Sequence, residues 1–259
     1  MNFRLYIFDL DGVIYRGDEP MPNAAQTVHR LRQEGKLVRF LTNNSALTRE
    51  AYVRRLTGMG ISCDEEDFMT SAYATALYLQ AQQAAGKRAY VVGEEGIYQE
   101  LRRIGMFTVT DPEEEGADYV VAGIDRQFTY EKLRRAHYAI QHGATFIATN
   151  RDATYPAAGG RIVPGGGAIV AAIQTCTGVE PLVIGKPNTY SMELLLQRCG
   201  VSPDEAVLIG DRLDTDVLVG KRSGLHTVLV LTGVTDADAL RHAPPEMQPE
   251  RVIQTLAEL

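Results

Sequence analysis

The chain has 259 residues, a formal net charge of −7 and 45% hydrophobic residues. It is long enough for one large domain or two modest ones. The acidic balance argues against a mainly electrostatic nucleic-acid binder, and no stretch approaches the roughly 18 apolar residues of a membrane helix. The first strand-like segment begins within four residues of Met1, so no signal peptide is expected. Three scattered cysteines favour a reducing, cytoplasmic setting.

The first predicted strand, residues 5–9, is followed by two carboxylates one residue apart. Strand side chains alternate, so Asp9 and Asp11 should point to the same side. Two like charges placed in this way repel each other unless a cation, a substrate or a proton compensates them. The simpler alternative is a polar turn built from Asp and Gly.

Helix-like and strand-like segments alternate along the chain. Further strands are predicted at 36–42, 88–93, 118–123, 145–150, 206–210 and 227–231. Helical patterns include 22–35, with Asn23 as N-cap and Gly35 as its end, 47–60, and 128–143. The acidic stretch 111–116 is predicted to be a solvated loop. This alternation predicts an α/β fold with a doubly wound parallel sheet.

The chain also contains a large insertion. Thr42 and Lys186 each follow a predicted strand but lie 144 positions apart, whereas a βαβ unit needs roughly 30 residues. We therefore expect a core formed by residues 1–81 and 182–259, and an inserted α/β domain formed by residues 82–181.

Ligands of doubly wound sheets bind beyond the carboxyl ends of the strands. Polar residues stand at four such ends: Asp9 and Asp11; Thr42, Asn43, Asn44 and Ser45; Lys186; and Asp211, Asp214 and Asp216. Two carboxylates such as Asp9 and Asp211, with a backbone carbonyl near Asp11, suit Mg²⁺. The alternative for Asp211 is an N-cap of the next helix.

The same strand ends could hold a phosphate. The Thr42 hydroxyl and nearby backbone N–H groups can face an anion, and Lys186 supplies a compact positive charge. Taken singly, each also fits a polar turn or a solvated lysine. Together they predict phosphoryl transfer, in which Asp9 attacks phosphorus and Asp11 moves the proton.

Four short motifs carry a family resemblance. "DLDGV", "LTNNS", "GKP" and "IGDRLDTD" occur in the order of the four motifs of the haloacid dehalogenase superfamily. The insertion follows the second motif, as in the NagD-type subgroup, which includes p-nitrophenyl phosphatases. The stretch "ATNRDATYPAAGGRIVPGGGAIV" also looks like that subgroup's inserted domain, called the cap.

The resemblance implies a role for each motif residue. It makes Asp9 the nucleophile and a Mg²⁺ ligand, and Asp11 the acid/base and a ligand through its backbone carbonyl. Thr42 and Asn43 would contact the phosphate, and Lys186 would stabilise the phosphate and orient Asp9. Asp211 would be a metal ligand, and Asp216 would support the metal's water shell. Asp214 is not part of the family pattern, and a solvated helix position is expected.

In the cap, a substrate-selecting loop is expected among Asn150, Arg151, Asp152, Tyr155 and Arg161. The glycines of "PGGGA" fit either a helix start that approaches an anion or a tight connection. We expect Mg²⁺-dependent hydrolysis of a small phosphorylated metabolite through an aspartyl-phosphate. The alternatives are a phosphotransferase or mutase, a dehalogenase, and a non-catalytic binding protein. Caps of this subgroup often mediate dimers, so a homodimer is also considered.

Overall fold

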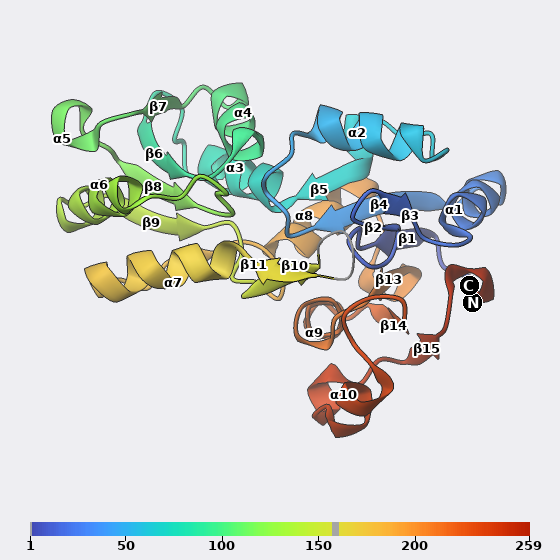
Figure 1. The fold of residues 1–259 in the computed structure, drawn as a ribbon. Coiled ribbons are helices and arrows are strands. Elements are labelled where there is room, and N and C mark those ends of the chain that lie inside the picture. Colours follow the sequence, from blue (N-terminus) through green and yellow to red (C-terminus); the bar gives the residue numbers. More distant parts are fainter. Residues whose placement is uncertain (1, 157–160) are drawn as a thin grey trace.

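The computed structural model describes residues 2–156 and 161–259. Six parallel strands form the first sheet in the order β15-β14-β13-β1-β4-β5 (Figure 1). Their bounds are β1 Leu5–Phe8, β4 Leu37–Thr42, β5 Phe68–Thr70, β13 Ala206–Gly210, β14 His226–Val230 and β15 Arg251–Ile253. The predicted α/β fold with a parallel sheet is confirmed.

The register of the central strands brings the motif residues together. Phe8 of β1 lies beside Phe40 of β4 on one side and Ile209 of β13 on the other. Because all three strands run in the same direction, Asp9, Thr42 and Asp211 leave the sheet at the same edge. All four residues of β1 are buried, as expected for a strand covered on both faces.

Helices cover both faces of this sheet: α1 Ala24–Gln33 and α2 Arg49–Gly58 on one face, and α3 Ser71–Ala81, α8 Tyr190–Cys199 and α9 Leu218–Arg222 on the other. Helix α10 Ala237–His242 has no buried residue. A short hairpin, β2 Tyr15–Arg16 and β3 Glu19–Pro20, follows β1. Asn23 is the N-cap of α1, as predicted. Asn23 has the N-cap position but a left-handed backbone (φ 65°), and its side chain makes no capping hydrogen bond. Its backbone carbonyl instead accepts from the Thr27 N–H.

The insertion contains a second parallel sheet in the order β12-β9-β8-β6-β7 (Figure 1). The strands are β6 Arg88–Val92, β7 Phe107–Val109, β8 Tyr119–Ala122, β9 Thr145–Ala148 and β12 Leu182–Val183, and the helices are α4 Glu95–Arg103, α5 Pro112–Glu115, α6 Tyr130–Gln141 and α7 Gly166–Thr177. The acidic stretch is therefore a short helix, α5, capped by Asp111, and not the expected loop. A two-stranded hairpin, β10 Thr154–Pro156 and β11 Ile162–Pro164, precedes α7.

Strand β12 helps to locate the boundary between the predicted core and the inserted domain. We expected the second part of the core to begin at residue 182, but Leu182–Val183 pairs with β9 of the second sheet. We therefore propose that the chain returns to the core after Val183. The core is the part that carries the six-stranded sheet, and the cap is the part that carries the five-stranded sheet.

The core and the cap share one buried interior. A single apolar cluster contains Leu41 and Leu208 of the first sheet together with Val91 and Ile147 of the second. At its edge, Arg49 of α2 pairs with Glu100 of α4 at 2.7 Å, and both side chains are buried. None of the helices in residues 2–156 and 161–259 is both long enough and apolar enough to span a membrane.

Candidate active site

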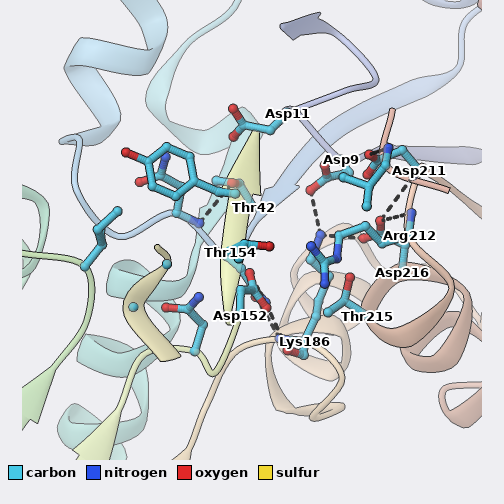
Figure 2. Close-up of a pocket in the computed structure, with 18 residues that line it drawn as sticks. Asp9, Asp11, Thr42, Asp152, Thr154, Lys186, Asp211, Arg212, Thr215 and Asp216 are labelled. Carbon is cyan, nitrogen blue, oxygen red and sulfur yellow. Dashed lines mark hydrogen bonds and ion pairs between the residues drawn. The ribbon is translucent and has the colours of Figure 1, made fainter. Parts of the chain in front are cut away.

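A pocket lies at the carboxyl ends of β1, β4 and β13, where the cap meets the core (Figure 2). The predicted core residues that line it are Asp9, Asp11, Thr42, Asn43, Lys186, Asp211 and Asp216. The cap contributes Asn150, Asp152 and Tyr155 from the predicted loop. The structure thus gathers residues that are up to about 200 positions apart in the sequence around one pocket.

Lys186 connects two of the carboxylates. Its Nζ donates to Asp9 Oδ1 and to Asp216 Oδ1, each at 2.6 Å, and to the Leu41 carbonyl at 3.3 Å. An ammonium group has three N–H donors, so all three are used. Burial disfavours the charged ammonium, but Asp216 and Asp9 outweigh this effect and raise the pKa of Lys186. The geometry suits a lysine that holds Asp9 in place.

Three carboxylates form a compact acidic group. Asp9, Asp211 and Asp216 each offer an oxygen within 4.8 Å of the others, and all three side chains are buried. Asp211 Oδ2 accepts from the Val234 backbone N–H at 2.7 Å, while its buried Oδ1 has no hydrogen-bond partner among the described residues. Burial, and then the negative charge of Asp216, raise the pKa of Asp211 to about 7.

This group fits a hard divalent cation. Buried carboxylate oxygens are costly to leave without a partner, and Mg²⁺ is normally held by one or two carboxylates. Burial raises the pKa of Asp9 well above its usual value, with Asp216 and Asp211 adding to the effect and Lys186 opposing it. A cation placed beside these oxygens would favour their ionised forms.

Two glycines allow Asp211 to approach. A Cβ on Gly12 would lie 2.5 Å from Asp211 Oδ2, and one on Gly233 would lie 1.9 Å from the same atom. Gly12 also has a left-handed backbone (φ 85°), which an L side chain rarely adopts. Asp211 is not an N-cap: Arg212 occupies that position, before the π-helical turn Leu213–Val217. The capping alternative for Asp211 is therefore wrong.

Asp11 and Thr42 face the pocket from neighbouring strand ends (Figure 2). Burial raises the pKa of Asp11 to about 6, against the opposing effect of Arg55 and Lys186. Thr42 Oγ1 accepts from the backbone N–H of Asn44 at 3.1 Å, which leaves its hydroxyl hydrogen able to donate. Asp11 therefore has the properties of a proton donor, and Thr42 those of an anion contact.

Asn43 is occupied by structural hydrogen bonds. Its Oδ1 accepts from the Lys186 N–H at 2.8 Å, and its Nδ2 donates to the Lys186 carbonyl at 2.9 Å and to Asp152 Oδ1 at 3.0 Å. Because the carboxamide is used in this way, the phosphate contact predicted for Asn43 is left to its backbone N–H. The hydrogen bond from Asn43 to Asp152 also joins the core to the cap.

The two other aspartates of the last motif differ in exposure. Asp216 is buried, and its Oδ2 accepts from the backbone N–H groups of Asp211 and Arg212 at 3.2 and 3.1 Å. It therefore supports both Lys186 and the chain at Asp211. Asp214 is solvent-exposed, as expected, but its carboxylate also pairs with Arg212.

The predicted cap loop is divided by the structure. Asn150, Asp152 and Tyr155 line the pocket, whereas Arg151 pairs with Glu180 at 2.7 Å on the surface. Arg161 lies in an adjoining groove of the cap, beside Tyr155 and Val163. Burial raises the pKa of Asp152, although Arg212 and Lys186 oppose it.

The glycine run has a packing role. Cβ atoms on Gly165 and Gly167 would lie 2.3 Å from the backbone carbonyls of Asp152 and Arg151, respectively. These glycines therefore allow the start of α7 to press against the predicted cap loop, which favours the tight-connection interpretation. Gly165 and Gly166 also line the pocket.

Several lining residues have no role predicted from the sequence, among them Arg212, Thr215 and Val234. Arg212 is the notable one, because it carries a charge and directly follows Asp211. Its place in the last motif was the signal that could have found it.

Two family models match the chain. A haloacid dehalogenase-like hydrolase model matches residues 6–107, and a HAD-hydrolase-like model matches residues 183–259. The chain belongs to the haloacid dehalogenase-like hydrolases. This family membership confirms the resemblance seen in the four motifs.

Among the relatives of this haloacid dehalogenase-like hydrolase is the 5'-nucleotidase YutF of Bacillus subtilis. It is 37% identical over 258 residues, which cover 99% of this chain and 97% of the relative. NagD from E. coli has a TM-score of 0.88 at 34% identity and covers 100% of this chain and 99% of its own. The glycerol phosphate phosphatase Rv1692 from Mycobacterium tuberculosis, solved in complex with magnesium, has a TM-score of 0.91 at 33% identity, over 99% of this chain and 76% of its own.

Proposed function

We propose that this haloacid dehalogenase-like hydrolase is a Mg²⁺-dependent phosphatase of small phosphate monoesters, with Asp9 as nucleophile. The observation that carries the proposal is the contact of Lys186 with both Asp9 and Asp216, beside the unpartnered Oδ1 of Asp211. A nucleophile, a fixed positive charge and a cation site thus lie within one pocket. Relatives named as a 5'-nucleotidase and a glycerol phosphate phosphatase support the reaction type without choosing a substrate.

The reaction proceeds in two displacements. An Asp9 carboxylate oxygen attacks phosphorus, and the bond from phosphorus to the alcohol oxygen breaks as Asp11 gives that oxygen a proton. A water molecule then attacks the aspartyl-phosphate at phosphorus, Asp11 takes the proton from the water, and Asp9 is released with inorganic phosphate. A pKa of about 6 suits Asp11 for both transfers near neutral pH.

The remaining groups position and compensate charge. Thr42 and the backbone N–H groups at the end of β4 would bind the phosphoryl oxygens, while Lys186 keeps Asp9 aimed at phosphorus. Asp9, Asp211 and the Asp11 backbone carbonyl would hold Mg²⁺, with Asp216 behind them. When bound, the ion would offset the charge that otherwise repels an anionic nucleophile from an anionic substrate.

Cap residues such as Asp152 and Tyr155 line the pocket together with Asp9, which favours a small substrate. A phosphotransferase or mutase would use the same groups but would have to exclude water from the intermediate. A homodimer and a cytoplasmic location stay predictions from the sequence.

The test of the proposed function is the variant Asp9→Asn, which removes the nucleophile and nearly preserves its shape. We expect the purified protein to release phosphate from small monoesters with Mg²⁺, and the variant to release none while its circular dichroism is unchanged. Turnover retained by the variant would exclude Asp9 as nucleophile. Transfer of phosphate to an added sugar or alcohol, without release, would favour a phosphotransferase.

A further inference from the structure

Arg212 is a cation in the pocket that the proposed mechanism does not use. It directly follows Asp211 and lines the same pocket as Asp9 (Figure 2). Its side chain is 19% exposed, so the charge is largely removed from water. A largely buried guanidinium is normally paired with an anion.

Asp214 satisfies only one edge of this guanidinium. Nε donates to Asp214 Oδ1 at 3.1 Å, and Nη2 donates to Asp214 Oδ2 at 2.8 Å. A guanidinium has five N–H donors, so three are left over. Within the described part of the chain, no other residue accepts a hydrogen bond from these three. Asp214, whose role the sequence left open, therefore fixes Arg212 by one edge and leaves the other edge available.

The other cation of the pocket has no donor left. Lys186 donates its three N–H groups to Asp9, Asp216 and the Leu41 carbonyl. Among the described lining residues, Lys186 and Arg212 are the only cations, against five aspartates: Asp9, Asp11, Asp152, Asp211 and Asp216. Within the described lining of this pocket, Arg212 is therefore the cation that can still donate to an anionic group of a ligand.

Arg212 lines the pocket together with Asp152 of the cap. Besides Asp214, the carboxylates of Asp152 and Asp211 raise the pKa of Arg212, Asp152 more strongly, although burial opposes them. Asp152 belongs to the cap, and Asn43 holds its carboxylate in place. Because Asp9 attacks from the core side, the leaving group of a substrate must extend toward the cap. Arg212, a core residue, lines this same pocket beside the cap residue Asp152.

We propose that Arg212 is a specificity-determining residue that binds a second anionic group on the leaving group of the substrate, a carboxylate or a second phosphate. This inference rests on the proposed phosphatase function. A guanidinium held by one edge can form two parallel hydrogen bonds with such a group. Asp214 is then a positioning residue for Arg212.

The test compares two substrates of similar size, 2-phosphoglycolate and ethylene glycol monophosphate, in which a carboxylate is replaced by an uncharged hydroxymethyl group. The measured quantity is the ratio of their kcat/KM values. A charged hydrogen-bonded pair is commonly worth about a tenfold preference or more. We therefore expect wild-type protein to prefer phosphoglycolate, and Arg212→Met to lower the ratio about tenfold. Arg212→Lys keeps the positive charge but not the bidentate geometry of the guanidinium, so it should lower the ratio less.

Two further variants separate specificity from folding. Asp214→Asn should lower the same ratio partially, because Arg212 loses its anchor but keeps its charge. Arg241→Met breaks a similar local Arg–Asp pair, with Asp238, on the exposed helix α10, so its ratio should equal that of wild type. If Arg212→Met and Arg212→Lys leave the ratio of the two kcat/KM values unchanged, whether or not both kcat/KM values fall, the assignment of Arg212 would be overturned. Wild-type protein that releases phosphate from no monoester would overturn the proposed function itself.

Discussion

The side chain of Asn43 pairs with both backbone polar groups of Lys186, accepting from its N–H at 2.8 Å and donating to its carbonyl at 2.9 Å. This double contact links the strand end of β4 to the "GKP" turn, which lies 143 positions later in the chain. The lysine that donates a hydrogen bond to Asp9 is itself held by a residue expected to bind phosphate.

Replacing Asn43 with Ala should therefore affect both stability and turnover. Two buried backbone groups would lose their partners, so the free energy of unfolding should fall by about 1–3 kcal/mol. Displacement of Lys186 from Asp9 should lower kcat by about 10- to 100-fold. Urea unfolding and initial rates would measure the two effects. Asn188→Ala is the control, because Asn188 is exposed and caps only the Tyr190 N–H. A normal kcat in Asn43→Ala would refute the orienting role.

Gly233→Ala should weaken metal binding specifically. The new Cβ would lie 1.9 Å from Asp211 Oδ2, so the carboxylate has to move. Displacing a metal ligand or its support typically costs about 10- to 100-fold in affinity. Isothermal titration with Mg²⁺ would measure the loss. Gly58→Ala is the matched control, since no atom lies within 4 Å of its Cβ. It should bind Mg²⁺ normally and gain up to about 1 kcal/mol of stability. Equal affinity in the two variants would contradict the expectation.

The stability of the metal-free protein should fall between about pH 4 and pH 7, in part through Asp211. Burial and Asp216 raise the pKa of its carboxyl to about 7 in the folded chain, whereas an unfolded aspartate titrates near about 4. The folded state then binds more protons than the unfolded state in this range, so raising the pH favours unfolding. Thermal unfolding with EDTA at several pH values would show the slope.

Asp211→Asn isolates this contribution. The variant should lose part of the slope and should be more stable than wild type at pH 7 without metal, because one buried repulsive charge is gone. Added Mg²⁺ should raise the melting temperature of wild type, since it binds the folded state, and should raise that of the variant much less. The same Mg²⁺ stabilisation in both proteins would show that Asp211 is not a ligand.

The sequence predicted the central part of the site because parallel strands align their carboxyl ends. Asp9, Thr42 and Asp211 each follow a short apolar run, and the sheet alone brings them together. The cap loop was harder to predict. Arg151 and Asp152 are adjacent in the sequence, but Arg151 faces the surface and Asp152 faces the pocket. The packing of α7 against this loop determines which of the two side chains reaches the pocket. The proposed role of Arg212 depends on a pocket that cap residues such as Asp152 complete, and no local pattern specifies where Asp152 lies.

The buried interior shared by the two sheets has a consequence for folding. Leu41 and Ile147 belong to one apolar cluster, and the Gly96 N–H donates to the Ala46 carbonyl across the same boundary. Apolar surface buried mutually by two parts makes the loss of one part costly to the other. The two sheets should therefore unfold in one cooperative transition. A truncated chain that keeps only the six-stranded sheet would expose the apolar surface that the cap normally covers, and it should aggregate.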